Sequence, residues 1–356
     1  MRLVYLIFLP VSVLLAEAAY SQQPAQVHCR HDDKECAAKA IQGHVITKLD
    51  YWKGAFARPV EQRIGAAPPE LVEYLTLDNI QSGFPDQPRS AKLRQDFLRD
   101  VRAAIAELPR SVRALLSAKL AGIYFVQDLG GTGYTDEIFD AHSNPVAGFV
   151  VLDMSVLDKA ANAWATWKEN TPFKAQPGFR LTAAIESKEQ DSRKNAIQYI
   201  LLHELGHVVS INEKIHPSWN VEPKDVSSPA DYPFFSLSWT ISRADNRYLT
   251  IFDDTFPQRG DVVYYLGAKL PAAQMVDTYD NLARTNFATL YSVTKPGDDF
   301  AEAFASYVHT VLMKKPFEIR IYAKGRIARV YRSCWAQQRC AAKRRILEDF
   351  LKIRSR

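Results

Sequence analysis

The chain has 356 residues, of which 47% are hydrophobic and 24% charged, so its composition excludes a disordered or fibrous protein and allows a sizeable core. The formal net charge is only +5, and basic residues cluster only at the C-terminal end. A nucleic-acid partner is therefore not expected, because such partners are bound by a stronger and clustered positive charge.

The first 21 residues indicate a secretory signal peptide. Arg2 precedes an apolar run over residues 3–16, which is too short to span a bilayer comfortably. Small residues in "AEA" at 16–18 and "AYS" at 19–21 offer two cleavage sites. We expect an exported protein, periplasmic or secreted, whose mature chain has no membrane span. An uncleaved anchor is the alternative.

Four cysteines occur in two close pairs, Cys29 with Cys36 and Cys334 with Cys340. Export favours disulfides, and the closeness of each pair along the chain favours two short local bridges. Two alternatives stay open: a bridge that joins the two ends of the chain, and a zinc site from "HCRH" at 28–31 together with Cys36.

Residues 22–120 are predicted as a helical N-terminal segment. Apolar residues recur at three- and four-residue spacing in "PPELVEYLTLDNI" and again after Ser90, with a break at Pro109. No cluster of catalytic residue types occurs in this segment, so we interpret it as a helical packing unit.

From residue 122 the pattern becomes that of strands. Residues 123–129, 137–141 and 147–157 are strand candidates, and "GGTGYT" after the first of them is interpreted as a hairpin loop. The last candidate contains "AGFVVLD", which we expect to be an edge strand against which an extended peptide could pair.

Two further regions complete the chain. Residues 211–290 are aromatic and proline-bearing with weak periodicity, which predicts loops and short elements that line a site. Residues 326–356 are predicted as a basic C-terminal helical extension with a cysteine pair. Its basic face is best explained by solvation, and docking on an acidic surface is the alternative.

The stretch "IQYILLHELGHVVS", residues 197–210, puts two histidines and a glutamate into an otherwise apolar helix, and Asp191 or Ser192 is its expected N-cap. His203 and His207 are four residues apart, so both rings can bind one zinc ion from the same helix face. Glu204 is rotated off that face, where it can act as general base on a water molecule held by the metal. Gly206 would let another backbone approach closely. The alternative is two core histidines with backbone partners.

A catalytic zinc usually has three protein ligands, and no histidine follows at the interval of the long "HExxHxxGxxH" motif. A second helix, predicted from Pro296, offers Asp298 and Glu302 on one face, so that one could bind the metal and the other could orient a ligand histidine. The alternative is that Asp298 and its neighbour merely favour the positive end of that helix. The histidines that stand alone are interpreted as structural: His142, His216 and His309.

"HELGHVV" together with "TLYSVTKPGDDFAEAF" resembles the zinc peptidase domain of the anthrax lethal factor family, within the zincins whose third ligand is a glutamate. In that family a tyrosine lies seven residues before the ligand carboxylate, and an Ala-Glu-Ala-Phe run follows it. Here Tyr291 lies seven residues before Asp298, and "AEAF" follows at 301–304. The resemblance covers about residues 195–310.

The resemblance implies an α+β, zincin-like domain over residues 121–325, with a small mixed sheet over the HExxH helix and a mostly helical second lobe. It implies that Tyr291 stabilises the tetrahedral intermediate and that the two histidines ligate zinc. The departure is Asp298, where the family has glutamate. Because aspartate is one methylene shorter, the second helix must lie closer, or Glu302 must take over the ligand role. The gapless match favours Asp298.

The sequence therefore predicts an exported zinc metallopeptidase with one Zn²⁺ per chain, which hydrolyses protein or peptide substrates with Glu204 as general base. Two alternatives are a catalytically silent zinc-binding interaction protein, which the shortened Asp298 favours, and a zinc amide hydrolase acting on cell-wall peptide. No pattern in the chain indicates an oligomeric state.

Overall fold

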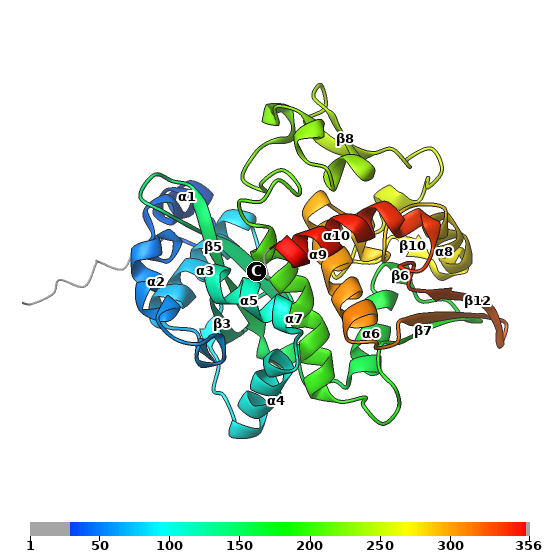
Figure 1. Ribbon diagram of the computed structural model, residues 1–356, viewed down its shortest axis with the longest axis horizontal. Coiled ribbons are helices and arrows are strands. Elements are labelled where there is room, and N and C mark those ends of the chain that lie inside the picture. The colour runs from blue at the N-terminus through cyan, green and yellow to red at the C-terminus, as the bar shows by residue number, and fades with distance from the viewer. Residues whose placement is uncertain (1–28, 354–356) are drawn as a thin grey trace, which may run out of the picture.

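The computed structural model describes residues 29–353, so the predicted signal peptide and residues 22–28 lie outside the described residues. The fold is α+β, as predicted, and its elements surround one long helix, α7 (Arg193–Ser210) (Figure 1). A five-stranded sheet and the N-terminal helices lie on one side of α7. Further helices and smaller sheets lie on the other side.

The largest sheet is mixed and has the strand order β1-β3-β5-β4, with the short strand β2 beside β3. Strands β1, β3 and β5 are parallel, whereas β4 is antiparallel to β5. The two central strands are almost continuously buried, which explains why their sequences are apolar runs without alternation. The bounds are β1 Ile64–Ala66, β2 Arg89–Ser90, β3 Leu120–Gln127, β4 Gly133–Phe139 and β5 Pro145–Asp153.

Two details of the strand prediction are wrong. Strand β5, which contains "AGFVVLD", is interior, and its neighbour β4 is an edge strand of the sheet. Strand β4 also begins at Gly133, so half of the predicted hairpin loop "GGTGYT" belongs to it. Apolar content could not reveal this order, because it reports burial and not which neighbours a strand has.

The N-terminal segment is helical, as predicted, but it also supplies β1 and β2. Helices α4 and α5 pack on α7, and β1 extends the sheet, so the hydrophobic core is continuous across residue 120. The predicted boundary there does not separate two cores. The helices are α1 Lys34–Gly43, α2 Leu49–Phe56, α3 Pro69–Ser82, α4 Gln95–Ala106 and α5 Arg110–Lys119.

The other side of α7 is mostly helical, and α9 is the helix most closely packed along it. A π-helical turn, residues 308–312, continues α9. The helices are α6 Ala161–Asn170, α8 Met275–Ala283, α9 Pro296–Tyr307 and α10 Ala341–Ile353. The short sheets use β6 Phe173–Lys174, β7 Phe179–Ala184, β8 Trp239–Ser242, β9 Arg247–Thr250, β10 Leu270–Pro271, β11 Glu318–Ala323 and β12 Arg326–Arg332.

Both predicted local disulfides are present. Cys29 is bonded to Cys36, and Cys334 to Cys340, which excludes an end-to-end bridge and a zinc site on Cys36. Within residues 29–353, no helix has the length and apolar character needed to cross a membrane.

The C-terminal helix α10 is held to the core by a buried ion pair. Lys343 is fully buried, and its Nζ lies 2.6 Å from Oδ1 of Asp299 on α9. The expectation that the basic face of this tail is solvated therefore fails at Lys343. The helix period alone could not reveal this, because the partner lies 44 residues away in the chain.

Candidate metal centre

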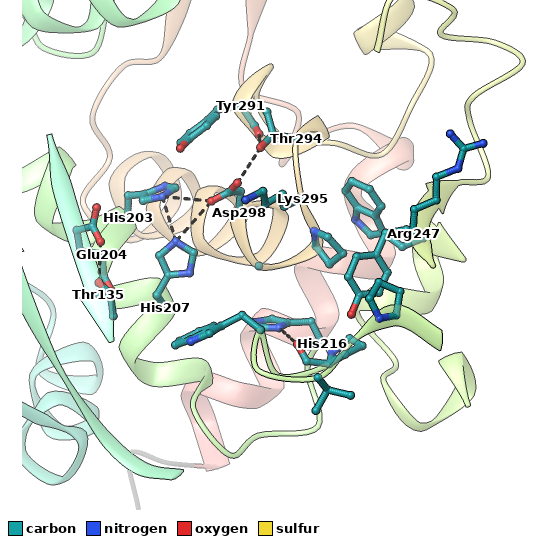
Figure 2. A pocket seen from close by; sticks show the side chains of 18 of the residues that line it. Thr135, His203, Glu204, His207, His216, Arg247, Tyr291, Thr294, Lys295 and Asp298 are labelled. Atoms are coloured by element: carbon teal, nitrogen blue, oxygen red, sulfur yellow. Dashed lines mark hydrogen bonds and ion pairs between the residues drawn. The ribbon is translucent and has the colours of Figure 1, made fainter. Parts of the chain in front are cut away.

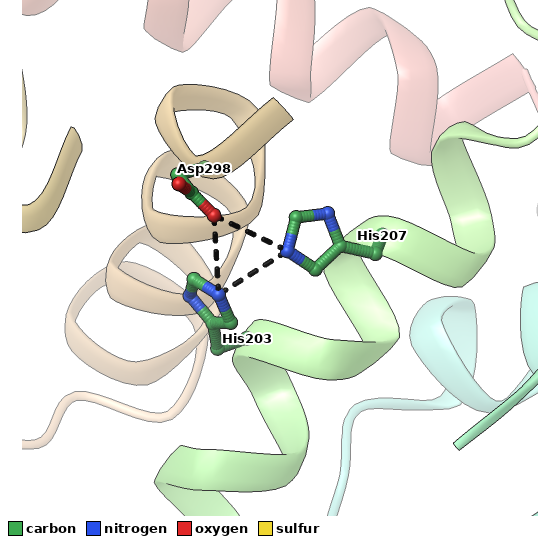
Figure 3. A group of neighbouring side chains, drawn as sticks. All are labelled: His203, His207 and Asp298. Atoms are coloured by element: carbon green, nitrogen blue, oxygen red, sulfur yellow. Dashed lines mark hydrogen bonds and ion pairs between the residues drawn. The ribbon is translucent and has the colours of Figure 1, made fainter. Parts of the chain in front are cut away.

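Helix α7 carries the two histidines into the interior. Ser192 caps it, as one of the two predicted N-caps, by accepting a hydrogen bond from the backbone N–H of Asn195. The helix is buried nearly all round, and His203 and His207 project from the face that is turned toward α9 (Figure 3).

Gly206 sets the distance between α7 and α9. A Cβ atom at this position would lie 2.7 Å from Cα of Ala301, which is closer than real Cβ contacts allow. The expectation that this glycine permits close backbone approach is confirmed. Close approach is what a short aspartate on α9 requires if it is to reach the histidines.

Asp298 joins the two histidines in one triangle (Figure 3). Nε2 of His203 lies 3.2 Å from Nε2 of His207, and Oδ1 of Asp298 lies 3.9 Å and 3.6 Å from these two nitrogens. The point in the plane of these three atoms that is equidistant from them lies about 2.1 Å from each, which is the bond length that zinc makes with imidazole nitrogen and carboxylate oxygen. The donor set and its spacing therefore fit a zinc ion.

Glu302 does not belong to this triangle; it lies behind His203. Its Oε1 lies 3.0 Å from Nδ1 of His203, so this ring nitrogen donates the hydrogen bond and Nε2 keeps its lone pair toward the triangle. The same Oε1 accepts from Lys168 at 2.8 Å, and Oε2 accepts from Thr289 at 2.6 Å. For Asp298 and Glu302 the sequence suggested that one binds the metal and the other orients a ligand histidine. Glu302 is placed for the orienting role.

The electrostatics of these groups keep both carboxyls ionised. Burial raises the pKa of Glu302, but Lys168 and His203 outweigh it and hold the pKa well below its usual range. Burial also raises the pKa of Asp298, and His207, His203 and the Thr294 hydroxyl lower it further than burial raises it. An ionised carboxylate beside two imidazole nitrogens forms a donor set that a divalent cation can bind.

Thr294 fixes the orientation of Asp298. Its Oγ1 donates to Oδ2 of Asp298 at 2.8 Å, which leaves Oδ1 for the histidines (Figure 2). His207 has no comparable support, because its Nδ1 is buried without a hydrogen-bond partner among the described residues.

Glu204 lies beside the triangle and not in it, as predicted from the helix geometry. Its Oε2 accepts a hydrogen bond of 2.6 Å from Oγ1 of Thr135 on β4 (Figure 2). Gly133, two residues earlier on the same strand, leaves the space that the carboxylate occupies, because a Cβ there would overlap Oε1 of Glu204.

Tyr291 is stacked on His203, with ring centroids 5.3 Å apart. Burial and the nearby carboxylate of Asp298 raise its pKa well above the ordinary value, so the phenol stays protonated and can donate. Its hydroxyl makes no hydrogen bond within residues 29–353, and the side chain lines the cavities described next.

Two cavities meet at Glu204, His203 and Tyr291. The larger has a volume of about 760 Å³ and the smaller about 400 Å³. Figure 2 shows residues that line the larger one. The aromatic stretch lines the larger one, as predicted for residues 211–290, through Trp219, Val221, Trp239, Arg247 and Tyr248. Helix α3 contributes to the smaller one, so the predicted N-terminal packing unit also forms a wall of the site.

The histidines interpreted as structural have partners elsewhere or lie at the surface. His216 lines the larger cavity, but its ring nitrogens contact the carbonyl of Pro217 at 2.8 Å and the hydroxyl of Ser210 at 3.1 Å. His309 contacts the carbonyl of Ile185, and His142 is exposed.

The sequence did not reveal five residues of the site: Gly133, Thr135, Lys168, Thr289 and Thr294. The spacing of Thr294, four residues before Asp298, was the one available signal.

Comparison of the chain with protein-family models, curated proteins and solved structures gives no match.

Proposed function

We propose that this protein is an exported zinc-dependent peptidase, related to the zincins by its HExxH helix. One observation carries the proposal: His203, His207 and Asp298 present three ligand atoms at zinc spacing, on the wall of a cavity that Glu204 also lines. Three protein ligands beside an open cavity are the arrangement of catalytic zinc sites, whereas structural sites are closed by four.

The residues of the triangle would hold the metal, and Glu302 would support it from behind His203. A zinc ion bound there supplies Lewis acidity, which polarises a carbonyl and lowers the pKa of water. A hydrogen bond that a ligand histidine donates to a carboxylate raises the basicity of that ligand and fixes its ring. The buried Lys168 keeps Glu302 ionised for this purpose.

The chain itself supplies the proton transfers. Glu204 is ionisable, faces both cavities and is oriented by Thr135, so it accepts a proton from the attacking water and returns it to the leaving amine. Tyr291 keeps its proton and has a hydroxyl without a partner in the described structure, so it donates a hydrogen bond to the oxygen that becomes negative.

The outer edge of β4 suits an extended peptide substrate. Residues 133–135 line the larger cavity beside Glu204, and β4 is an edge strand of its sheet. At the far end, Phe139 forms a bridge with Lys48, so the edge is covered there, whereas residues 133–135 border the cavity. An unpaired strand edge binds an extended chain through backbone hydrogen bonds. The sequence suggested β5 as the strand that pairs with the substrate, and we now propose β4 for this role.

Metal content is the first test. We expect about one zinc per chain by elemental analysis of the mature protein, lost in Asp298→Ala, because this variant removes one of three ligands. The exposed His142→Ala is a matched control that should keep zinc. Loss of zinc in Glu302→Ala with retention in Asp298→Ala would reverse the ligand assignment. Absence of zinc from the reconstituted wild type would overturn the proposal.

Turnover is the second test, with Glu204→Gln as the decisive variant. Hydrolysis of casein by the zinc-loaded wild type, abolished in Glu204→Gln with zinc content unchanged, supports a peptidase. Hydrolysis of cell-wall peptide fragments but not of casein would assign a cell-wall amide hydrolase instead. Zinc binding with no hydrolysis of either substrate would assign a zinc-binding interaction protein.

A further inference from the structure

A strained turn carries Tyr265 into the cavity beside the proposed metal site. The backbone N–H of Leu266 donates to the carbonyl of Tyr264 at 2.7 Å, and Tyr265 between them has φ of +66°. This is the γ-turn with positive φ, which is rare and strained. A bulky residue with positive φ is an outlier, since glycine would adopt the same turn with less strain.

The surroundings of the turn hold it in place. The buried hydroxyl of Tyr264 donates to Oε2 of Glu169 at 2.9 Å, and Leu270 pairs in strand β10 just beyond. Between these anchors, the ring of Tyr265 lies 5.5 Å from that of Trp167 and 6.1 Å from that of Tyr291, centroid to centroid. Strain persists only where neighbours over-determine it, and it concentrates at functional sites.

Tyr265 lines the 400 Å³ cavity together with His203, Glu204 and Tyr291. Its ring is only partly buried, and in the described part of the chain its hydroxyl makes no hydrogen bond. Burial and the carboxylates around the site raise its pKa well above the ordinary value, so the phenol keeps its proton at neutral pH. Two protonated hydroxyls, neither hydrogen-bonded to any of the described residues, therefore border the same cavity as the general base.

We propose that Tyr265 is a second catalytic hydroxyl, which donates a hydrogen bond to the substrate oxyanion together with Tyr291. The proposal rests on the proposed peptidase function and adds a residue that the HExxH motif and the Tyr291 spacing do not indicate. The strained turn directs the phenol of Tyr265 into the cavity, while the neighbouring Tyr264 holds Glu169. This role in catalysis accounts for the strain.

The first experiment measures casein hydrolysis by the zinc-loaded protein and its Tyr265→Phe, Tyr291→Phe and Tyr322→Phe variants. Tyr322, on β11, is a control outside both cavities. Removal of one oxyanion donor lowers kcat by about 10²–10³-fold. We expect such a loss for Tyr265→Phe, with KM within about twofold, because the ground state does not carry the negative charge. An unchanged kcat would overturn the proposal.

Two further measurements test the role of Tyr265 separately from the proposed peptidase function. Zinc content and Tm of Tyr265→Phe should equal those of wild type, since the ring is kept and the hydroxyl has no protein partner among the described residues. Calorimetric titration with acetohydroxamate, an oxyanion-bearing zinc ligand, should show about tenfold weaker binding in Tyr265→Phe and none of this change in Tyr322→Phe. If the wild type binds hydroxamate about tenfold more tightly than Tyr265→Phe but does not hydrolyse casein, the peptidase function fails while the donor role of Tyr265 holds. Equal hydroxamate affinity would refute the donor role.

Discussion

Lys168 and Glu302 form a buried ion pair of 2.8 Å, and the same oxygen of Glu302 accepts the hydrogen bond from His203. Both charged side chains are almost fully buried, at 4% and 1% exposure. A buried charge without a partner is costly, so each group depends on the other. The pair thereby connects helix α6 to one edge of the proposed metal site.

The Glu302→Gln variant tests the supporting role of this carboxylate. We expect zinc to bind still at one ion per chain, but about 10–100-fold more weakly, because loss of the partner of a ligand histidine has effects of this size. Competition with a chromogenic chelator measures the affinity. The free energy of unfolding should also fall by about 3–5 kcal/mol, because Lys168 loses its closest counter-charge. An affinity equal to that of wild type would contradict the role.

Gly206→Ala tests the close approach of the two helices. The added methyl group would collide with the backbone of Ala301, and overpacking of this kind costs about 1–3 kcal/mol of unfolding free energy. Because the collision moves Asp298 away from the histidines, zinc affinity should fall as well.

The matched control for this variant is Gly54→Ala. Gly54 is also helical, but a Cβ there meets nothing within 4 Å. This change should stabilise the protein by about 1 kcal/mol through helix propensity and leave zinc binding unaltered. Chemical denaturation and chelator competition on both variants give the comparison, and equal behaviour of the two would refute the packing argument.

Gly133→Ala tests the space kept for Glu204. The new methyl group would overlap the carboxylate, so the general base must move while the metal ligands stay in place. We expect normal zinc content and a kcat for casein lowered by about 10²-fold, since small misplacements of catalytic groups have effects of this size. Gly65→Ala, also in a strand of this sheet and with open space around it, should keep full activity. A fall in zinc content would instead point to a general distortion.

His309 should make the protein acid-sensitive. Burial lowers its pKa to about 4 from 6.5, against the raising effect of its hydrogen bond to the carbonyl of Ile185. Between these two values the unfolded chain binds a proton that the folded chain does not, so stability falls as pH decreases from 6.5 to 4 and is fully present above 6.5. The loss from this one group amounts to about 3 kcal/mol.

His309→Gln removes this titration and can keep a donor toward Ile185. Denaturation curves of both proteins are measured at several pH values. The unfolding free energy of wild type minus that of the variant should decrease as pH falls from 6.5 to 4. Parallel pH dependences would show that His309 already titrates normally in the folded state.

The ion pair between Lys343 and Asp299 should anchor the C-terminal helix. Both side chains are fully buried, and Asp299 also accepts a hydrogen bond from Nε1 of Trp239 at 3.0 Å. Lys343→Met should lower the free energy of unfolding by about 3–5 kcal/mol, because the carboxylate is left without its counter-charge. The double variant with Asp299→Asn should recover part of that loss. A single-variant effect below 1 kcal/mol would contradict the anchoring role.

The sequence by itself determined the local part of the site. A four-residue interval places His203 and His207 on one helix face, and one further residue turns Glu204 away from it, whatever the rest of the fold. The disulfides were equally local, because each cysteine pair is separated by a few residues. The seven-residue spacing between Tyr291 and Asp298 favoured Asp298 as the third ligand by resemblance.

Only the tertiary structure decided which carboxylate lies with the two Nε2 atoms, because Asp298 and Glu302 lie on the same face of α9 and reach different nitrogens of His203. Asp298 lies near Nε2, and Glu302 accepts a hydrogen bond from Nδ1. The separation of α7 and α9 depends on the contact between Gly206 and Ala301, which are 95 residues apart in the numbering. Packing between segments that are distant in the chain also decided three other features: the strand order, the pairing of Lys168 with Glu302 and the turn at Tyr265. Periodicity reports which face of an element is buried, but the partner that a buried side chain contacts is set by packing between distant segments.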